Sequence, residues 1–284
     1  MSQVYCPFPE NYELIDAGGG KKLERWGEMI TIRPEHQAYF PAGLKPQEWK
    51  ALAHWEFVSD TPAGLNGKWK ALKPPVPKSW IFHSDDIHAQ LELTSNKHIG
   101  IFPEQHYNWQ FIRETLLPQQ RFLNLFAYTG IASLVGRTTG AEVTHVDAVR
   151  TMLDWARLNM ETSGLNDIRW VLEDARKFVN RELKRGNRYE LIQMDPPAWG
   201  LGANREKWRI EDLLPSLIEE AGALLTSKGT LIINTYSPKI ELKDLNRILQ
   251  RMSREFSGEA KELWMESTSG KRLYFGLVAR VTKK

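Results

Sequence analysis

The feature that most constrains the fold is a repeated alternation of short apolar runs and longer amphipathic stretches after residue 120. Strands and helices that alternate in this way form βαβ units and therefore a parallel sheet. The predicted strands are Arg121–Phe126, Glu142–Asp147, Ile168–Leu172, Leu191–Asp195 and Thr230–Thr235. The predicted helices are Ile131–Thr138, Val149–Thr162, Ala175–Arg185 and Ile210–Leu225. The pattern thus predicts an α/β domain with a mainly parallel sheet.

The segments on either side of this region have a different character. Lys261–Glu266 and Leu273–Thr282 indicate two β runs, which we interpret as an antiparallel hairpin at one edge of the sheet. Upstream, glycines and prolines interrupt short β-like runs, which indicates turns rather than long helices. We expect a small β-rich module over residues 1–85 and a second domain over residues 86–284. The strands predicted in the small module are Tyr12–Ala17, Glu28–Arg33 and Trp55–Ser59. A proline-rich linker is expected at 73–77, after which Ile87–Thr94 is predicted to begin a strand leading into the second domain.

Composition limits the class of protein. The 284 residues are 42% hydrophobic and 26% charged, which suits folded domains with a buried core. No apolar run of about 18 residues and no secretory leader is visible, so we expect a cytoplasmic protein without membrane contact. Cys6 is the only cysteine, which excludes intrachain disulfides and a cysteine-built zinc site, and we expect no metal. The net charge of +3 permits a polyanionic partner without requiring one.

The first strand of the parallel region runs directly into a short turn before a helix. The segment reads Asn124-Leu-Phe126-Ala-Tyr128-Thr129-Gly130. In open α/β sheets a ligand binds outside the carboxyl ends of the strands, and the first such turn makes the closest contact. Only one glycine marks the turn, so the G-x-G-x-x-G pattern of pyrophosphate sites is missing. We expect a ligand other than a pyrophosphate to approach the backbone here.

Acidic residues close the second and third predicted strands. Asp147 follows the first turn at the distance at which an acid holds a ribose hydroxyl pair in such folds. Glu173 and Asp174 can accept a hydrogen bond from an adenine amino group, because an ionised carboxylate is only an acceptor. Helix N-capping is the alternative for these acids. An acid for the ribose at the end of one strand and acids for the adenine at the end of the next match the two parts of an adenosine.

The fourth predicted strand ends in Asp195-Pro196-Pro197-Ala198-Trp199. Consecutive prolines cannot continue a central strand, so they turn the chain out at the end of the sheet. A carboxylate, the loop carbonyls and an indole then converge, which suits orienting an amino group and stacking a planar ring. A rigid loop with a packing tryptophan is the alternative.

Taken together, these segments resemble class I S-adenosylmethionine (SAM)-dependent methyltransferases, and among them the bacterial large-subunit ribosomal RNA methyltransferases. The motifs that carry the resemblance are Asn124–Gly130, Val146-Asp147, Leu172–Asp174 and Asp195–Pro197. It covers the chain from about residue 89 onward and includes Lys97–Asn108, which looks like the segment that lines the methionine end of the cofactor. Pro103-Glu104-Gln105 departs from the family pattern within that segment.

The resemblance implies a Rossmann-like class I methyltransferase sheet of seven strands, the last antiparallel, preceded by the small β-rich module. It implies SAM as cofactor, with Asp147 at the ribose and Asp174 at the adenine, and ribosomal RNA as partner. The implied catalytic residues are Asp195, Pro196, Pro197 and Trp199. The implied cofactor-binding residues are Glu104, Gln105, Asn108, Asn124, Phe126, Tyr128, Thr129, Gly130, Asp147, Glu173, Asp174 and Asp195.

The segment after the fifth predicted strand constrains the acceptor atom. Covalent cytosine-5 methylation requires a cysteine thiolate that attacks the ring. The related cytosine-5 enzymes carry that cysteine after the fifth strand, where this chain has Asn234-Thr-Tyr236-Ser-Pro238. We therefore expect direct transfer to a base nitrogen, with Asn234 and Tyr236 as further candidates for the acceptor pocket.

Three other functions are compatible with parts of the sequence. They are a small-molecule methyltransferase, a catalytically silent protein that binds SAM or RNA, and a nicotinamide-dependent oxidoreductase. The missing glycines and the double proline argue against the last one. Arg205, Lys207 and Arg209 come after the double proline and can either contact phosphates or lie at a solvated helix start.

Overall fold

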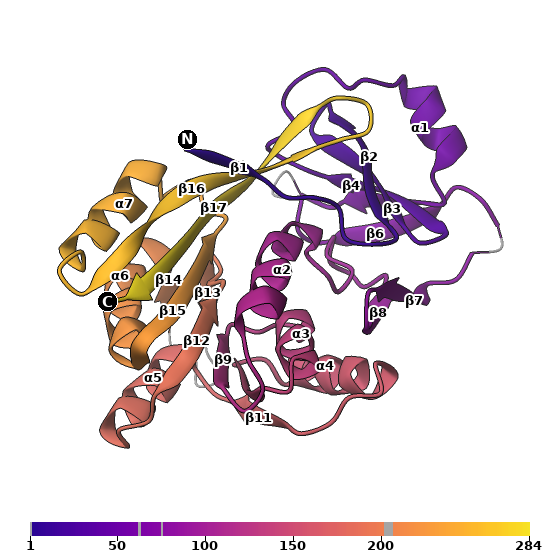
Figure 1. The fold of residues 1–284 in the computed structure, drawn as a ribbon. Coiled ribbons are helices and arrows are strands. Elements are labelled where there is room, and N and C mark those ends of the chain that lie inside the picture. The colour runs from indigo at the N-terminus through magenta and orange to yellow at the C-terminus, as the bar shows by residue number, and fades with distance from the viewer. Residues whose placement is uncertain (1, 62–63, 75, 202–206) are drawn as a thin grey trace. The chain divides into compact units, whose positions relative to one another are not determined.

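A computed structural model of the chain describes residues 2–61, 64–74, 76–201 and 207–284. The chain divides into two compact units (Figure 1). The large unit comprises Met1–Val4, Asn108–Leu263 and Gly276–Lys284, and the small unit comprises Tyr5–Tyr107 and Trp264–Phe275. The expected division into a domain of residues 1–85 and a domain of residues 86–284, each folding separately, stays a prediction. Pro75 of the predicted linker and Arg205 lie outside the described residues.

The main sheet has eight strands in the described part of the chain. Their order is β1 (Gln3–Tyr5), β16 (Phe256–Glu266), β17 (Arg272–Lys283), β15 (Leu225–Thr235), β12 (Tyr189–Met194), β9 (Arg121–Leu125), β10 (Glu142–Asp147) and β11 (Ile168–Leu172). Strands β15, β12, β9, β10 and β11 pair in parallel, whereas β17 runs antiparallel to β15. The predicted Rossmann-like sheet with an antiparallel last strand is confirmed, and β1 adds one strand to the seven expected.

The strand order reverses at β9, which lies between β10 and β12. From β9 the chain continues to β10 and β11 on one side and then crosses to β12 on the other. The loops after β9 and β12 therefore diverge, which makes their carboxyl ends the topological switch point where ligands bind in such sheets. Met194 of β12 is in register with Leu125 of β9 and with Ile233 of β15. The segments after these three strands thus leave the sheet next to one another.

Four helices come after the strands as the periodicity predicts. They are α3 (Ile131–Thr138), α4 (Arg150–Thr162), α5 (Ala175–Lys184) and α6 (Ile210–Ala223). Each buries an apolar side: Leu134 of α3, Leu153 of α4, Phe178 of α5 and Leu217 of α6 are at most 1% exposed. Helix α3 packs on β9 and β10, and α5 packs against α6. The helices thus cover the sheet and leave the carboxyl ends of its strands for the connecting loops.

Several short elements of the large unit were not expected from the sequence. Helices α2 (His106–Thr115) and α7 (Leu242–Arg251) have ten residues each, and β13 (Trp199–Leu201) pairs with β14 (Lys207–Arg209) as a small hairpin. The strands of the hairpin have three residues each, which is too short for an alternating pattern to stand out. Within the described ranges, no helix has the length and apolar character needed to cross a membrane.

The small unit is built on a second, five-stranded sheet, as expected for a β-rich module. Its order is β2 (Tyr12–Gly18), β3 (Lys21–Trp26), β4 (Met29–Pro34), β5 (Trp55–Ser59) and β6 (Gly67–Ala71). Helix α1 (Pro46–Leu52) buries Trp49 against Ile15 and Leu23 of this sheet. The predicted strand Ile87–Thr94 is β8 (Ile87–Glu92), which forms a hairpin with β7 (Ser79–Ser84).

A buried ion pair stabilises the small unit. The guanidinium of Arg33 donates to both carboxylate oxygens of Glu24, with Nε and Nη2 at 2.7 and 2.8 Å, and neither side chain is more than 4% exposed. Tyr12 donates its hydroxyl to the same carboxylate at 3.0 Å, and Lys22 lies 3.3 Å from it. Burial alone would raise the pKa of Glu24, but Arg33 and Lys22 outweigh burial and lower the pKa to about 2. The cluster therefore stays ionised without contact with solvent.

Candidate functional site

The turn after β9 has an unusual backbone. Phe126, Tyr128 and Gly130 all have positive φ, at 55°, 52° and 89°. A left-handed conformation costs about 1–3 kcal/mol at a non-glycine residue and is concentrated at ligand sites. At Gly130 an added Cβ would lie 2.9 Å from the Cβ of Ala156, so both the backbone angle and the space require glycine. The turn thus brings bare backbone to the carboxyl end of β9.

Asp147 at the end of β10 holds this turn. Its Oδ2 accepts from the backbone N–H of Tyr128 at 2.9 Å, and its Oδ1 accepts from the N–H of Val149 at 2.9 Å. Burial raises the pKa of Asp147, and the backbone hydrogen bonds only partly oppose that rise. Each carboxylate oxygen can accept more than one hydrogen bond, so the side chain can also accept from a pair of hydroxyls. Asp147 precedes the α4 cap residue Val149 and is not itself the N-cap.

The two acids after β11 already have partners within the protein. Asp174 is the N-cap of α5 and accepts from the backbone N–H of Lys177 at 3.0 Å. Glu173 forms an ion pair with Arg181, whose Nη1 lies 2.6 Å from its carboxylate. The capping alternative is therefore correct for Asp174. Asp174 is only half-buried and its capping bond uses Oδ1, so Oδ2 can still accept a hydrogen bond from an adenine. That contact stays a prediction.

A series of buried side-chain hydrogen bonds supports the turn after β9. Asn124 donates from Nδ2 to the hydroxyl of Ser133 at 3.0 Å, and that hydroxyl lies 3.1 Å from Nδ1 of His145. Burial lowers the pKa of His145 to about 3, so its ring is neutral at physiological pH. The carbonyl of Thr129 accepts from the Asn159 side chain at 2.9 Å. Asn124 and Thr129 are 3% and 1% exposed, so these bonds fix the turn before any ligand binds.

The Asp195-Pro196-Pro197 segment leaves β12 beside the turn, and a tryptophan that was not expected from the sequence joins the two. Trp208 of β14 donates its indole N–H to the carbonyl of Pro197 at 2.6 Å, and its ring centroid lies 5.0 Å from that of Phe126. Trp208 is 5% exposed, whereas Trp199 is 60% exposed. No local motif marks Trp208, because only the β13–β14 pairing brings it back to the double proline. Trp208 is thus the packing tryptophan, and Trp199 presents its ring to solvent.

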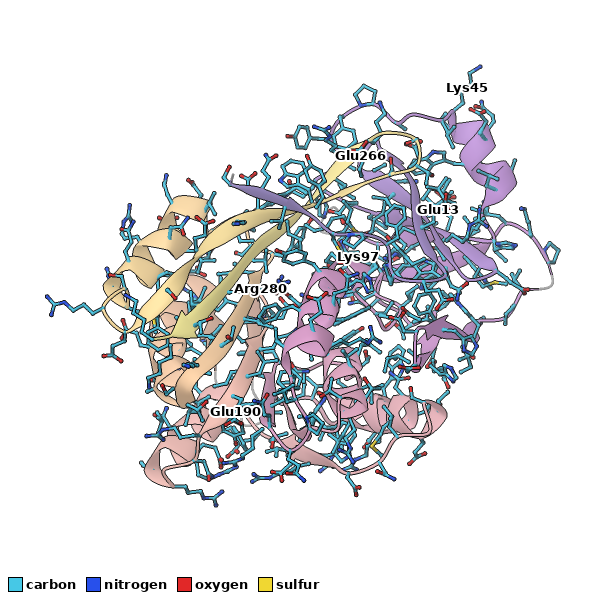
Figure 2. All side chains as sticks on the ribbon, in the orientation of Figure 1. Glu13, Lys45, Lys97, Glu190, Glu266 and Arg280 are labelled. Atoms are coloured by element: carbon cyan, nitrogen blue, oxygen red, sulfur yellow. The ribbon has the colours of Figure 1, made fainter. Side chains whose placement is uncertain are left out.

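Asn234 lies in β15, one residue after Ile233, which is in register with Met194 of β12, and helix α2 supplies a partner for it. Asn108 of α2 donates from Nδ2 to the side-chain oxygen of Asn234 at 2.5 Å. Its own oxygen accepts at 3.3 Å from Arg280 of β17, which is labelled in Figure 2. Asn108 and Asn234 are 0% and 3% exposed. Tyr236, two residues further, is 43% exposed. Asn108 is thus tied to the fifth parallel strand, and Tyr236 is an exposed aromatic side chain at that end.

Glu104 and Gln105 belong to the small unit. They lie in the 3-10 turn η1 (Pro103–Gln105), where Gln105 is buried and Glu104 is half-buried. The negative charge of Glu104 acts on Arg33 and raises its pKa further, after the larger effect of Glu24. Their contact with a cofactor stays a prediction.

Comparisons with known proteins identify the family of the chain. The family model described as S-adenosylmethionine-dependent methyltransferase matches residues 65–253. Ribosomal RNA large subunit methyltransferase K from Neisseria meningitidis is 34% identical over 155 residues, which cover 51% of this chain and 42% of that protein. The chain spans less than half of the length of the curated relatives it matches.

Two solved structures extend the likeness to nearly the whole chain. A SAM-dependent methyltransferase from Agrobacterium tumefaciens matches with a TM-score of 0.92 and 32% identity, covering 100% of this chain and 95% of that one. SMU.776, proposed to be a methyltransferase and solved in complex with SAH, shares the fold with a TM-score of 0.76 and 15% identity, over 96% of this chain and 75% of that one. The chain belongs to the S-adenosylmethionine-dependent methyltransferase family, and SAM is its cofactor.

Proposed function

We propose that this protein methylates a base nitrogen of ribosomal RNA by direct transfer from SAM. The observation that carries the proposal is the Asp195-Pro196-Pro197 segment at the switch point, which Trp208 links to Phe126 of the turn after β9. Two exposed aromatic residues, Trp199 and Tyr236, follow the same edge of the sheet in the segments after β12 and β15. Exposed aromatic rings stack on nucleobases, at about 1–3 kcal/mol per base. Relatives named as ribosomal RNA methyltransferases support RNA as the acceptor.

The residues fit SAM without a phosphate site. The strained turn at residues 126–130 offers backbone for close approach, and Asp147 offers carboxylate oxygens for the ribose hydroxyls. Asp174 stands at the next strand end for the adenine. When bound, SAM supplies a methyl group that a nitrogen lone pair can attack directly. The protein's own contribution is orientation, which can lower the barrier substantially when the reacting atoms are held in line.

Asp195 is the residue proposed to orient the acceptor. Its carboxylate can accept an N–H of the base, which points the nitrogen lone pair toward the methyl group, and it can accept the proton that leaves after transfer. Covalent cytosine-5 chemistry is not part of the proposal, because Cys6 is buried in the small unit, where its Sγ donates to the carbonyls of Pro7 and Pro103. We propose that this activity takes place in the cytoplasm.

Transfer of a labelled methyl group from SAM to total RNA from a strain lacking this gene tests the proposal. We expect label in large ribosomal RNA with the wild type, and a loss of about 100-fold or more in rate with Asp195→Asn, which keeps the size but removes the charge. Asp212→Asn, at the start of α6, is the matched control and should keep full activity. Digestion of the RNA then identifies the base.

Label that enters only small metabolites would overturn the RNA acceptor. Label that stays in SAM although SAH binds would overturn the activity itself. Label recovered as 5-methylcytosine would contradict direct transfer to nitrogen.

A further inference from the structure

A basic cavity lies beside the candidate cofactor site in the large unit. It has a volume of about 470 Å³ and is lined by the cations Arg176, Lys177, Arg181 and Lys184 of α5 and Lys207 of β14. We call it the α5 groove. Among the described residues that line it, Asp174 is the only acid, and two of the five cations, Arg176 and Arg181, have acidic partners outside the lining. The three lysines still exceed the single lining acid, and such an excess of positive charge favours an anionic ligand.

The cations of the groove differ in how far they are exposed to solvent. Arg181 is fixed by Glu173 at 2.6 Å, and Arg176 lies 3.8 Å from Glu220. Lys177, Lys184 and Lys207 are exposed. Long, exposed lysine side chains are suited to contacting phosphates as point charges, whereas the paired arginines shape the wall of the groove.

The groove shares residues with the candidate site. Asp174, at the expected adenine position, and Trp208, which donates to the carbonyl of Pro197, are among its lining residues. From Asp174 to Lys184 the helix rises about 15 Å at 1.5 Å per residue. A nucleic-acid strand carries a charge about every 3.4 Å of helix axis, so several phosphates match this length.

The β13–β14 hairpin connects the groove to the acceptor loop. Lys207 and Trp208 of β14 line the groove, while the paired strand β13 begins with the exposed Trp199. A strand bound along α5 would therefore pass the hairpin on its way to Asp195. SAM itself carries no phosphate, so its adenosine gives no reason for five cations at this place.

We propose that the α5 groove binds the phosphodiester backbone of the RNA acceptor and thereby positions the target base at Asp195. This inference rests on the proposed function, because it assigns the groove to the same substrate. The groove contributes affinity and position and takes no part in the transfer step.

The test measures binding of a fluorescein-labelled, 20-nucleotide single-stranded RNA of mixed sequence to the full chain, by anisotropy over a range of salt concentrations. The groove variant combines Lys177→Gln, Lys184→Gln and Lys207→Gln. The matched control combines Lys228→Gln, Lys243→Gln and Lys261→Gln, which remove the same charge outside the groove lining. SAH binding is measured for both variants to verify the cofactor site.

We expect the groove variant to bind RNA at least tenfold more weakly than the wild type, and the control less than twofold. The slope of log affinity against log salt should flatten by about 2, since each lost phosphate contact removes about 0.7 from the slope for single strands. SAH affinity should stay within twofold for both. A single Lys184→Glu, the substitution farthest from Asp174 along α5, should weaken RNA binding in the same direction with SAH affinity unchanged.

The proposal is wrong if the groove and control variants lose RNA affinity equally, or if neither loses any. Loss of SAH binding by the groove variant together with unchanged RNA binding by Lys184→Glu would also overturn it. Failure of the proposed function has a separate signature, in which the wild type binds RNA and SAH but transfers no methyl group to ribosomal RNA. If the wild type methylates ribosomal RNA and the groove variant binds RNA with full affinity, the proposed function is supported. The proposal that the α5 groove binds RNA is then wrong.

Discussion

Glu24 of the small unit and Asp147 of the large unit are both shielded carboxylates, but their partners differ. Glu24 accepts from a guanidinium and a phenol, and the charge of Arg33 helps to lower its pKa to about 2. Burial raises the pKa of Asp147, and the side chain accepts only from backbone N–H groups, among them those of Tyr128 and Val149. A carboxylate with its counter-charge beside it stabilises the fold, whereas one held only by backbone dipoles retains capacity for a ligand.

Removing the charge at Glu24 should have the largest effect on stability. Glu24→Gln leaves Arg33 buried without its counter-charge, so we expect the free energy of unfolding to fall by about 3–5 kcal/mol in urea titrations. Glu13→Gln is the matched control, because its partner Arg25 lies at 2.8 Å but the two side chains are 28% and 41% exposed. That substitution should cost less than about 1 kcal/mol. Similar losses of stability in the two variants would show that the buried Glu24 contributes no more to the fold than the partly exposed Glu13.

The same pair provides a pH test. The folded-state pKa of Glu24, about 2, lies below its ordinary value of 4.5, so the ionised form is stabilised by folding. Its contribution is fully present above about pH 4.5 and is lost as the pH falls toward 2. The stability gap between wild type and Glu24→Gln should therefore narrow over that window. A gap that does not change with pH would show that Glu24 is not ionised in the folded protein.

Asp147→Asn should weaken the cofactor site with much less effect on the fold. An amide retains one acceptor oxygen but loses the charge, so the Kd for SAH should rise about 10- to 100-fold, or about 1.4–2.8 kcal/mol, in calorimetric titrations. Asp167→Asn, at a side chain that is 78% exposed, is the control and should bind SAH normally. Normal SAH affinity in Asp147→Asn would remove the ribose role.

The smallest expected effect separates the two tryptophans of the acceptor loop. Trp208→Phe keeps an aromatic ring near Phe126 but removes the indole hydrogen bond to Pro197, and should reduce stability by about 1 kcal/mol. Trp199→Phe changes a side chain that is 60% exposed and should change stability by less than about 0.5 kcal/mol. Thermal unfolding of both variants measures the difference. The reverse order would assign the packing role to Trp199.

Predictability from sequence depended on the turn signals around each element and not on its length alone. Strands β10 and β11 and helix α3 begin and end at the predicted residues, because each is a buried apolar run between clear turn signals. The β13–β14 hairpin was missed because strands of three residues carry no readable alternation, whereas α7 was missed although Leu245, Ile248 and Leu249 follow helical spacing after a capping box. In the candidate site, the placement of Asp147 and Asp195 at the same edge of the sheet could be predicted, because parallel strands end at one edge.

The partners of the site residues could not be predicted in the same way. Asp174 caps α5, Glu173 pairs with Arg181, and Asn124 supports the turn through Ser133. Each of these contacts depends on side-chain geometry, and several join segments that are distant in the sequence. Trp208 is the clearest case, because it lies 11 positions from Pro197 in the chain and reaches it only through the hairpin.

The amino-acid sequence by itself determined the parallel sheet, the order of the acids on its strands, and the double proline beside the first turn. The reason is that backbone periodicity, glycine and proline act locally. Only the tertiary structure decided which carboxylates are neutralised, which tryptophan packs and which is exposed, and that the cations of α5 and Lys207 line one groove. Charge compensation and burial are properties of the space around a side chain, and distant segments fill that space.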